Sequence, residues 1–248
     1  MEVARLLLVT ECSVEDLRKY LREDAAPTVV QPLGSTELHG PLPMGIDTIF
    51  ASAVAREVAQ RVNCALAPAV PYGHSPEHVG PGIVWIPVSL YADLVESVIN
   101  SFLDGGFKVI LLVNGHAGNS GILEAVARQV RRRRRAEVLI ADLWQLVGRC
   151  IDRRDFYGYC VAEVSLAMYL AGSKPSVGAD VGRERKPALS VRLECLIRPW
   201  LTGEIRGNLE EASQEASREM GEDIFRRIVE WVIADLEVVR REVGEPRG

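Results

Sequence analysis

Apolar runs rich in β-branched residues alternate with amphipathic stretches over much of the chain, and no other feature of the sequence constrains the fold as strongly. The runs cover 26–34, 64–73, 108–116 and 136–144, and the amphipathic stretches cover 48–62, 91–106 and 121–135. Alternation of strand and helix predicts a parallel sheet with helices on both faces. The run KVILLVN has no polar residue between its ends, as expected of a central parallel strand. We therefore expect an α/β fold of three layers, α/β/α, around a mostly parallel central sheet.

The chain beyond Trp144 shows this alternation less clearly. A helix is predicted over 162–171, and the Gly- and Pro-containing segment 177–207 is predicted to form loops with one hairpin over 190–198. A long amphipathic helix is predicted over 209–242, with one apolar stripe. The stripe consists of Ile224, Ile228, Trp231 and Leu236. Since no repeat or linker divides the 248 residues, we expect a single domain over 1–248.

Composition and charge exclude several classes of protein. Hydrophobic residues make up 48% of the chain and charged residues 25%, which excludes a disordered or low-complexity chain. No apolar run approaches the roughly 18 residues that a membrane span needs, and the first residues lack a secretory pattern, so we expect a cytoplasmic protein with no membrane partner. The net charge of −5 argues against nucleic acid as a partner. The basic run 131–135 ends a predicted helix, where cations favour the helix dipole, and five successive residues cannot share one face.

Polar side chains gather after two of the predicted strands. Glu37 and His39 follow the first strand within the segment GSTELHGPLPMGID, and their spacing puts them on one side of an extended backbone. His116 follows KVILLVN in the segment VNGHAGN. Ligands of open parallel sheets bind beyond the carboxyl ends of the strands, so we expect these two segments to converge there.

Oxygen and nitrogen ligands of these types suit zinc, manganese, iron(II) or cobalt. Asp47 lies eight residues beyond His39 across a loop that can fold back, and an aspartate can bridge two ions about 3.5 to 4 Å apart. Glu163, in the later predicted helix, offers a further carboxylate. The spacing alone is equally compatible with side chains that form hydrogen bonds and bind no metal.

Three segments resemble motifs of the creatininase family of metal-dependent amidohydrolases. The family's P-x-G-S-x-E-x-H-G-x-H-L-P-x-x-x-D motif is similar to PLGSTELHGPLPMGID at 32–47, and its N-G-H-x-G-N motif is similar to NGHAGN at 114–119. A weaker third likeness is YGHSPEHVGPGIVWIP at 72–87, which resembles Y-G-x-S-x-E-H followed by a Pro-Gly turn. The resemblance covers roughly 29–171.

This resemblance implies a site of two divalent metal ions, zinc, manganese or iron(II), in a homo-oligomer that is often a hexamer. The ligands that it implies are Glu37, His39, Asp47, His116 and Glu163, with Asp47 as the bridge. Related members carry H-A-G-E-x-E-T-S, whose histidine is assigned to proton transfer, but this chain has Gly158 at that position. Creatinine itself is therefore not the expected substrate.

The activity implied is hydrolysis of a non-peptide amide, cyclic or linear, by a metal-activated water. Departure of the amine needs a proton, for which His78 or Glu77 is the first candidate. Weaker candidates for this donor are Asp155, Tyr157 and Tyr159. Asn114 and Asn119 are expected to brace the loop around His116, and Ser35 and Thr36 to form hydrogen bonds rather than act as nucleophiles.

Two alternatives stay open. Archaeal relatives with a similar third motif deformylate a formylamino-pyrimidine ribosyl phosphate with iron(II) in riboflavin and deazaflavin biosynthesis, and Arg183, Arg185 and Lys186 could then bind the phosphate. The chain could otherwise be an inactive metal-binding regulatory protein. Retention of all the implied ligands argues against the second alternative, because buried carboxylates without cations are costly.

Overall fold

The central sheet of the protein is formed by parallel strands that lie side by side in the order β1-β3-β2-β4-β5. The computed structural model describes residues 6–134, 136–152, 156–172 and 212–245, without the side chains of 156–158. The strands are β1 (Leu7–Leu8), β2 (Thr28–Leu33), β3 (Ala65–Leu66), β4 (Val109–Asn114) and β5 (Glu137–Asp142). All four strand pairs are parallel, which confirms the expected sheet.

The two central strands, β2 and β4, are buried along their whole length. Their register pairs Leu33 with Asn114, and the register of β4 with β5 pairs Asn114 with Asp142. The carboxyl ends of three neighbouring strands are therefore level with one another. Residues that follow these strands emerge at one edge of the sheet, which is where the sequence places its polar segments.

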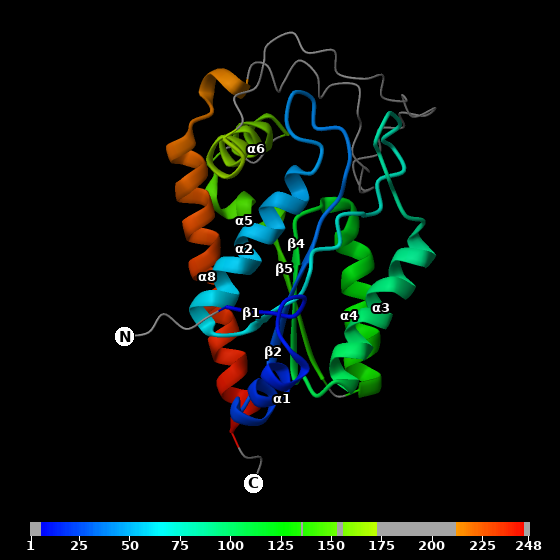
Figure 1. Cartoon of the computed structure of the whole chain (residues 1–248). Helices are drawn as coiled ribbons and strands as arrows, with labels where there is room; N and C mark the ends of the chain where they lie inside the picture. Colours follow the sequence, from blue (N-terminus) through cyan, green and yellow to red (C-terminus); the bar gives the residue numbers. More distant parts are fainter. Residues whose placement is uncertain (1–5, 135, 153–155, 173–211, 246–248) are drawn as a thin grey trace.

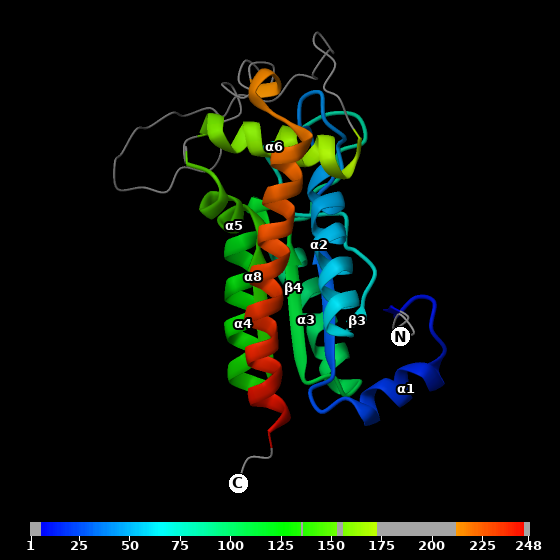
Figure 2. The same cartoon turned by 90° about the vertical axis from the view of Figure 1, so that its left-hand side faces the viewer.

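Helices cover both faces of the sheet, as the three-layer prediction requires. Their bounds are α1 (Val14–Glu23), α2 (Ile46–Val62), α3 (Val88–Asp104), α4 (Ser120–Arg134), α5 (Leu143–Cys150), α6 (Phe156–Leu170) and α8 (Arg218–Gly244). One apolar core joins α2, α5, α6 and α8 to the sheet, and a second joins α3 and α4 to its other face (Figures 1 and 2). Figure 2 shows α6 lying across the ends of α2 and α8, beyond the carboxyl ends of the strands.

Several elements differ from the expectation. β3 is only two residues long, and of the rest of the predicted strand 64–73 only Val70 and Gly73 form isolated bridges. α6 begins at Phe156 rather than at 162, and α8 begins at Arg218 rather than at 209. On α8, Trp231 is only partly buried, whereas Val232 and Ile233 are buried, because this helix packs against both α2 and α6. The predicted hairpin at 190–198 lies outside the described residues.

The basic run lies where the sequence predicts, at the end of α4. Arg131, Arg133 and Arg134 are exposed and form ion pairs with nearby carboxylates. The partners are Glu137, Glu96 and Asp104. Among the helices in the described ranges, none combines the length and the hydropathy that crossing a membrane requires.

Candidate metal centre

The loop between β2 and α2 folds back on itself, which brings its two ends together. The backbone N–H of Glu37 donates to the carbonyl of Met44 at 3.0 Å, and that of Leu42 donates to the carbonyl of His39 at 3.0 Å. Gly40, at the turn, has a φ of 57°, a conformation that favours glycine. Asp47, in the first turn of α2, is thereby returned to the side chains that follow β2.

The loop after β4 approaches the same point and is held by amide side chains. Asn114 donates to the carbonyl of His116 at 2.9 Å and accepts from its N–H at 3.2 Å. Asn119 donates to the carbonyl of Gly34 at 3.2 Å, which ties this loop to the one after β2. A Cβ added to Gly115 would overlap the backbone of Asp47, so only glycine permits this approach.

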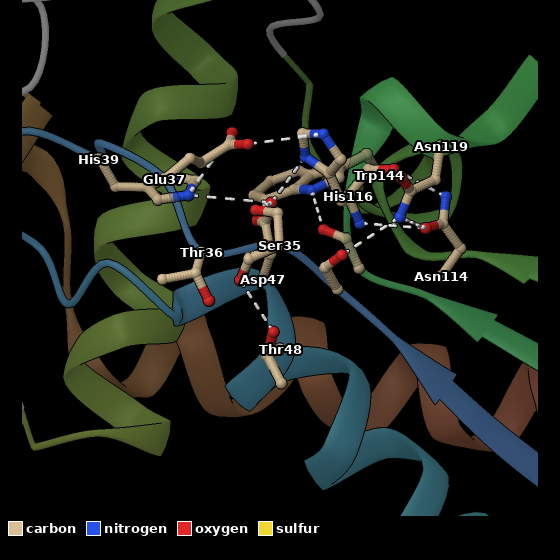
Figure 3. Close-up of polar contacts among 12 residues, drawn as sticks. Ser35, Thr36, Glu37, His39, Asp47, Thr48, Asn114, His116, Asn119 and Trp144 are labelled. Carbon is tan, nitrogen blue, oxygen red and sulfur yellow. Dashed lines mark hydrogen bonds and ion pairs between the residues drawn. The ribbon is translucent and has the colours of Figure 1, made fainter. Parts of the chain in front are cut away.

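Five side chains from four elements converge beside the first turn of α2 (Figure 3). Two groups have ligand atoms within 4.8 Å of one another, namely Glu37, Asp47 and His116, and His39, Asp47 and Glu163. Asp47 belongs to both groups. The structure thus brings together all five residues that the family resemblance implies as ligands.

The contacts within the cluster pair carboxylates with imidazoles. His39 Nδ1 lies 2.7 Å from Glu163 Oε1, and His116 Nδ1 lies 2.9 Å from Asp47 Oδ2. His116 Nε2 lies 3.5 Å from Glu37 Oε2. The hydroxyl of Ser35 donates to Asp47 Oδ2 at 2.9 Å and so fixes the orientation of the shared carboxylate.

Three polar atoms of this cluster are buried without a hydrogen-bond partner among the described residues. They are Glu37 Oε2, His39 Nε2 and Asp47 Oδ1. Buried polar atoms are normally satisfied, and atoms left unsatisfied at a carboxylate-rich site fit ligands of a cation. The donor set of carboxylate oxygens and imidazole nitrogens suits zinc, manganese or iron(II). The residues present therefore fit a divalent metal site.

The electrostatics of the cluster also favour a bound cation. Burial alone would lower the pKa of His39, but the carboxylates of Asp47, Glu163 and Glu37 raise it to about 10. Burial likewise lowers the pKa of His116, whereas Glu37 and Asp47 raise it to about 9. Burial would raise the pKa of Asp47, but the two histidines and the Ser35 hydroxyl lower it. An excess of buried carboxylate makes this position favourable for positive charge.

A cavity of about 120 Å³ opens onto the cluster. His78 and Glu77, the predicted proton donors, both line it, as does Tyr159. The side chain of Tyr157 and the whole of Asp155 lie outside the described part of the chain.

A family model matches most of the chain. The model, described as creatinine amidohydrolase (creatininase), covers residues 10–236. This chain belongs to the creatininase family.

Relatives of known function match only part of the chain. It is 36% identical over 107 residues to a 3-dehydro-scyllo-inosose hydrolase of Thermotoga maritima, covering 42% of this chain and 34% of that protein. It is 38% identical over 110 residues to a mycofactocin precursor peptide peptidase of Mycobacterium tuberculosis, covering 40% of this chain and 43% of that protein. The matched stretches thus span less than half the length of these relatives.

Solved creatininase structures share the fold over nearly the whole chain. A creatinine amidohydrolase aligns with a TM-score of 0.73 and 19% identity, covering 98% of this chain and 100% of the other. A Zn-Zn form of a mutant creatininase aligns with a TM-score of 0.72 and 19% identity, covering 97% and 99%. An Mn form aligns with a TM-score of 0.71 and 20% identity, covering 96% and 99%.

One wall of this creatininase-family site was not found from the sequence. Trp144 lines the cavity, and its indole N–H donates to the carbonyl of Gly115 at 2.6 Å. Its ring packs edge-on against Phe50 and Tyr159. The only local signal was its place directly after a strand, at the end of the sheet where ligands bind. The carbonyl of His74, in the loop after β3, lies 3.1 Å from His116 Nε2.

Proposed function

We propose that this creatininase-family protein is a metal-dependent amidohydrolase that cleaves a non-peptide C–N amide bond, cyclic or linear, in a small molecule other than creatinine. The observation that carries the proposal is the sharing of Asp47 between two ligand groups. A shared carboxylate is the arrangement by which a protein holds two ions close together. Glu37, His39, His116 and Glu163 complete the two groups.

Divalent ions bound there, zinc, manganese or iron(II), supply a water nucleophile of lowered pKa and polarise the substrate carbonyl. The chain's own residues hold this arrangement in place. Ser35 orients Asp47, and the amide of Asn114 fixes the backbone of His116. Such outer contacts set the direction of each ligand atom. Leu38 and Trp144 give the cavity apolar walls.

Proton transfer to the leaving amine is assigned in this proposal to His78. Its side chain is 9% exposed, and its Nε2 lies 3.5 Å from Glu37 Oε1. Its Nδ1 is buried and has no hydrogen-bond partner in the described ranges. Gly158 offers no imidazole at the family position, so His78 is the histidine left beside the cluster for this role.

The deformylase hypothesis stays as an alternative within the same chemistry, because a formamide is also an amide. Its phosphate would be bound by Arg183, Arg185 and Lys186, which lie outside the described residues. A metal-binding protein without turnover is the second alternative. Several expectations stay predictions of the sequence. They are a homo-oligomer, a hexamer by family resemblance, a cytoplasmic location, a single domain and the absence of nucleic-acid partners.

The test is metal-dependent hydrolysis of a panel of formamides, cyclic amides and linear amides, with and without a chelator. Short peptides join the panel because the mycobacterial relative is a precursor peptide peptidase. Glu37→Ala should abolish any activity that the panel reveals, whereas Glu57→Ala, at a half-buried carboxylate farther along α2, should leave it unchanged.

Activity that persists in Glu37→Ala or in the presence of the chelator would contradict the metal-hydrolase proposal. Bound metal without turnover of any panel member would favour the regulatory alternative. Circular dichroism of Glu37→Ala separates loss of the site from loss of the fold. Turnover of formamides alone would favour the deformylase hypothesis.

A further inference from the structure

The described wall of the cavity contains carboxylates and histidines but no lysine or arginine. Its carboxylates belong to Glu37, Asp47, Glu77 and Glu163, and its histidines are His39, His78 and His116. Glu37, Asp47 and Glu163 belong to the ligand groups, so bound divalent ions would offset their charge, and Glu77 would be the carboxylate left in this described wall to attract a cationic group.

Glu77 is the one carboxylate of this wall that neither ligand group includes. Within the described ranges, its side chain takes part in no hydrogen bond or ion pair. It is half-buried, and its backbone is fixed by a turn in which the N–H of His78 donates to the carbonyl of Ser75 at 3.2 Å. Ser75 is fully buried and anchors that turn. Among the described residues, Glu77 therefore presents an unpaired carboxylate from a turn in the cavity wall.

Two further observations at this wall point to a ligand. His78 lines the cavity next to Glu77, and its Nδ1 is buried without a hydrogen-bond partner among the described residues. Aromatic rings of Trp144 and Tyr159 line the same cavity, 6.4 Å apart between ring centres. The hydrogen bond from the Trp144 indole to Gly115 keeps that ring in place. A carboxylate together with aromatic rings is a common combination for binding an ammonium or a guanidinium group.

We propose that Glu77, with the aromatic wall of Trp144 and Tyr159, selects a substrate that carries a cationic group besides its amide. This inference rests on the proposed function, because it places the amide at the metal cluster and the cationic group at Glu77. The partly apolar surroundings strengthen the attraction relative to water. Glu77 is a specificity-determining residue in this scheme, and proton transfer stays with His78.

The test is equilibrium binding to the metal-loaded protein, measured by calorimetry with three amides of similar length. δ-Aminovaleramide carries an ammonium group, hexanamide is its neutral isostere, and glutaramate carries a carboxylate. We expect δ-aminovaleramide to bind about tenfold more tightly than hexanamide, the effect of one charge-assisted hydrogen bond. Glu77→Gln should reduce this preference to within about twofold, and Glu77→Lys should shift it toward glutaramate. Glu57→Gln, the same change at a half-buried carboxylate on α2, should leave the preference intact.

Equal binding of the three amides by the wild type, tighter binding of glutaramate, or no detectable binding of δ-aminovaleramide would each overturn the inference. A preference that persists in Glu77→Gln would overturn the assignment to Glu77. Mass spectrometry of the same samples reports hydrolysis separately. Charge-selective binding without hydrolysis would count against the proposed amidohydrolase activity but would support the selection of a cationic group by Glu77. Hydrolysis of all three amides at equal rates would support the amidohydrolase activity and count against that selection.

Discussion

Two clusters of polar side chains, one partly buried and one largely buried, lie at opposite ends of the sheet, and they are built differently. At the amino end, Arg240 donates to Asp24 Oδ2 at 2.7 Å and to the carbonyl of Val62 at 3.1 Å. The other oxygen of Asp24 accepts from the N–H of Ala26 at 2.9 Å. At the carboxyl end, Asp47 Oδ1 is buried with no hydrogen-bond partner in the described part of the chain.

The difference lies in charge balance as well as in hydrogen bonding. The amino-end cluster matches one guanidinium with one carboxylate, and it joins α8 to the segment between α1 and β2. The carboxyl-end cluster sets three carboxylates around two histidines. A balanced, satisfied cluster is sufficient for stability, whereas an excess of carboxylate with unsatisfied atoms needs cations. Matched substitutions should therefore separate a cluster that stabilises the fold from one that binds metal.

The largest expected effect is the loss of metal in Asp47→Asn. This change removes the charge of the carboxylate that both ligand groups share, so the metal content should fall from about two equivalents per chain to below one. The apparent metal affinity should weaken by at least about 100-fold, more than the loss of an outer-shell contact. Elemental analysis of protein purified without chelator measures the stoichiometry.

The matched control is Asp24→Asn, the same change in the amino-end cluster. It should leave the metal content unchanged and lower the free energy of unfolding, because Arg240 loses its charged partner. Two equivalents retained by Asp47→Asn would contradict the shared-ligand assignment. One equivalent in the wild type would favour a mononuclear site.

The next effect is the loss of stability in Arg240→Ala. The side chains of Arg240 and Asp24 are 17% and 14% exposed, so removal of the guanidinium leaves a nearly buried carboxylate without its partner. We expect the free energy of unfolding to fall by about 2 to 3 kcal/mol, with metal content unchanged. Urea denaturation measures the change, and Arg241→Ala, at the exposed neighbouring position, is the control. A decrease in the free energy of unfolding no larger than that of the control would show that the Arg240–Asp24 cluster does not stabilise the packing of α8.

The sequence predicted the carboxyl-end cluster much better than the amino-end one, for a physical reason. Glu37 and His39 lie in one loop and Asp47 in the helical turn directly after it, and His116 follows the neighbouring strand, so local spacing and sheet topology together bring them close. Glu163 depends on how α6 crosses the end of the sheet, so its place in a predicted helix offered it only as a further carboxylate, and the family resemblance implied it as a ligand.

No local pattern signals the residues that the sequence missed. Arg240 and Asp24 are 216 residues apart, and their contact exists only because α8 packs alongside α2. Trp144 became a wall of the cavity through the packing of α5 and α6. α1, by contrast, was missed although it has a local signal, namely a capping box at Ser13 and Asp16 and an apolar face of Leu17, Tyr20 and Leu21. Periodicity therefore predicted the sheet, whereas packing between distant helices decided these details.

A moderate effect is expected for Asn119→Ala, which removes a fully buried amide next to the metal cluster. This amide accepts from the N–H of His74 at 3.0 Å and donates to the carbonyl of Gly34 at 3.2 Å, so it joins the two loops that carry the ligands. We expect about tenfold weaker metal binding and a loss of about 1 to 2 kcal/mol in stability. Competition with a chromophoric chelator measures the affinity. Asn100→Ala, on α3, is the control, and equal affinities in the two variants would show that the bracing is not needed.

The smallest effect is expected for Arg133→Ala, which breaks an ion pair like that of Arg240 but on the surface. Arg133 Nη1 lies 2.8 Å from Glu96 Oε1, and the two side chains are 61% and 24% exposed. Water and salt screen this pair, so its removal should change the free energy of unfolding by less than about 0.5 kcal/mol, and even less at high salt. Double-mutant cycles in urea for Arg133 with Glu96 and for Arg240 with Asp24 compare the two pairs directly. Similar coupling energies would mean that burial does not distinguish them, and the contrast between the two ends of the sheet would then rest on the metal cluster alone.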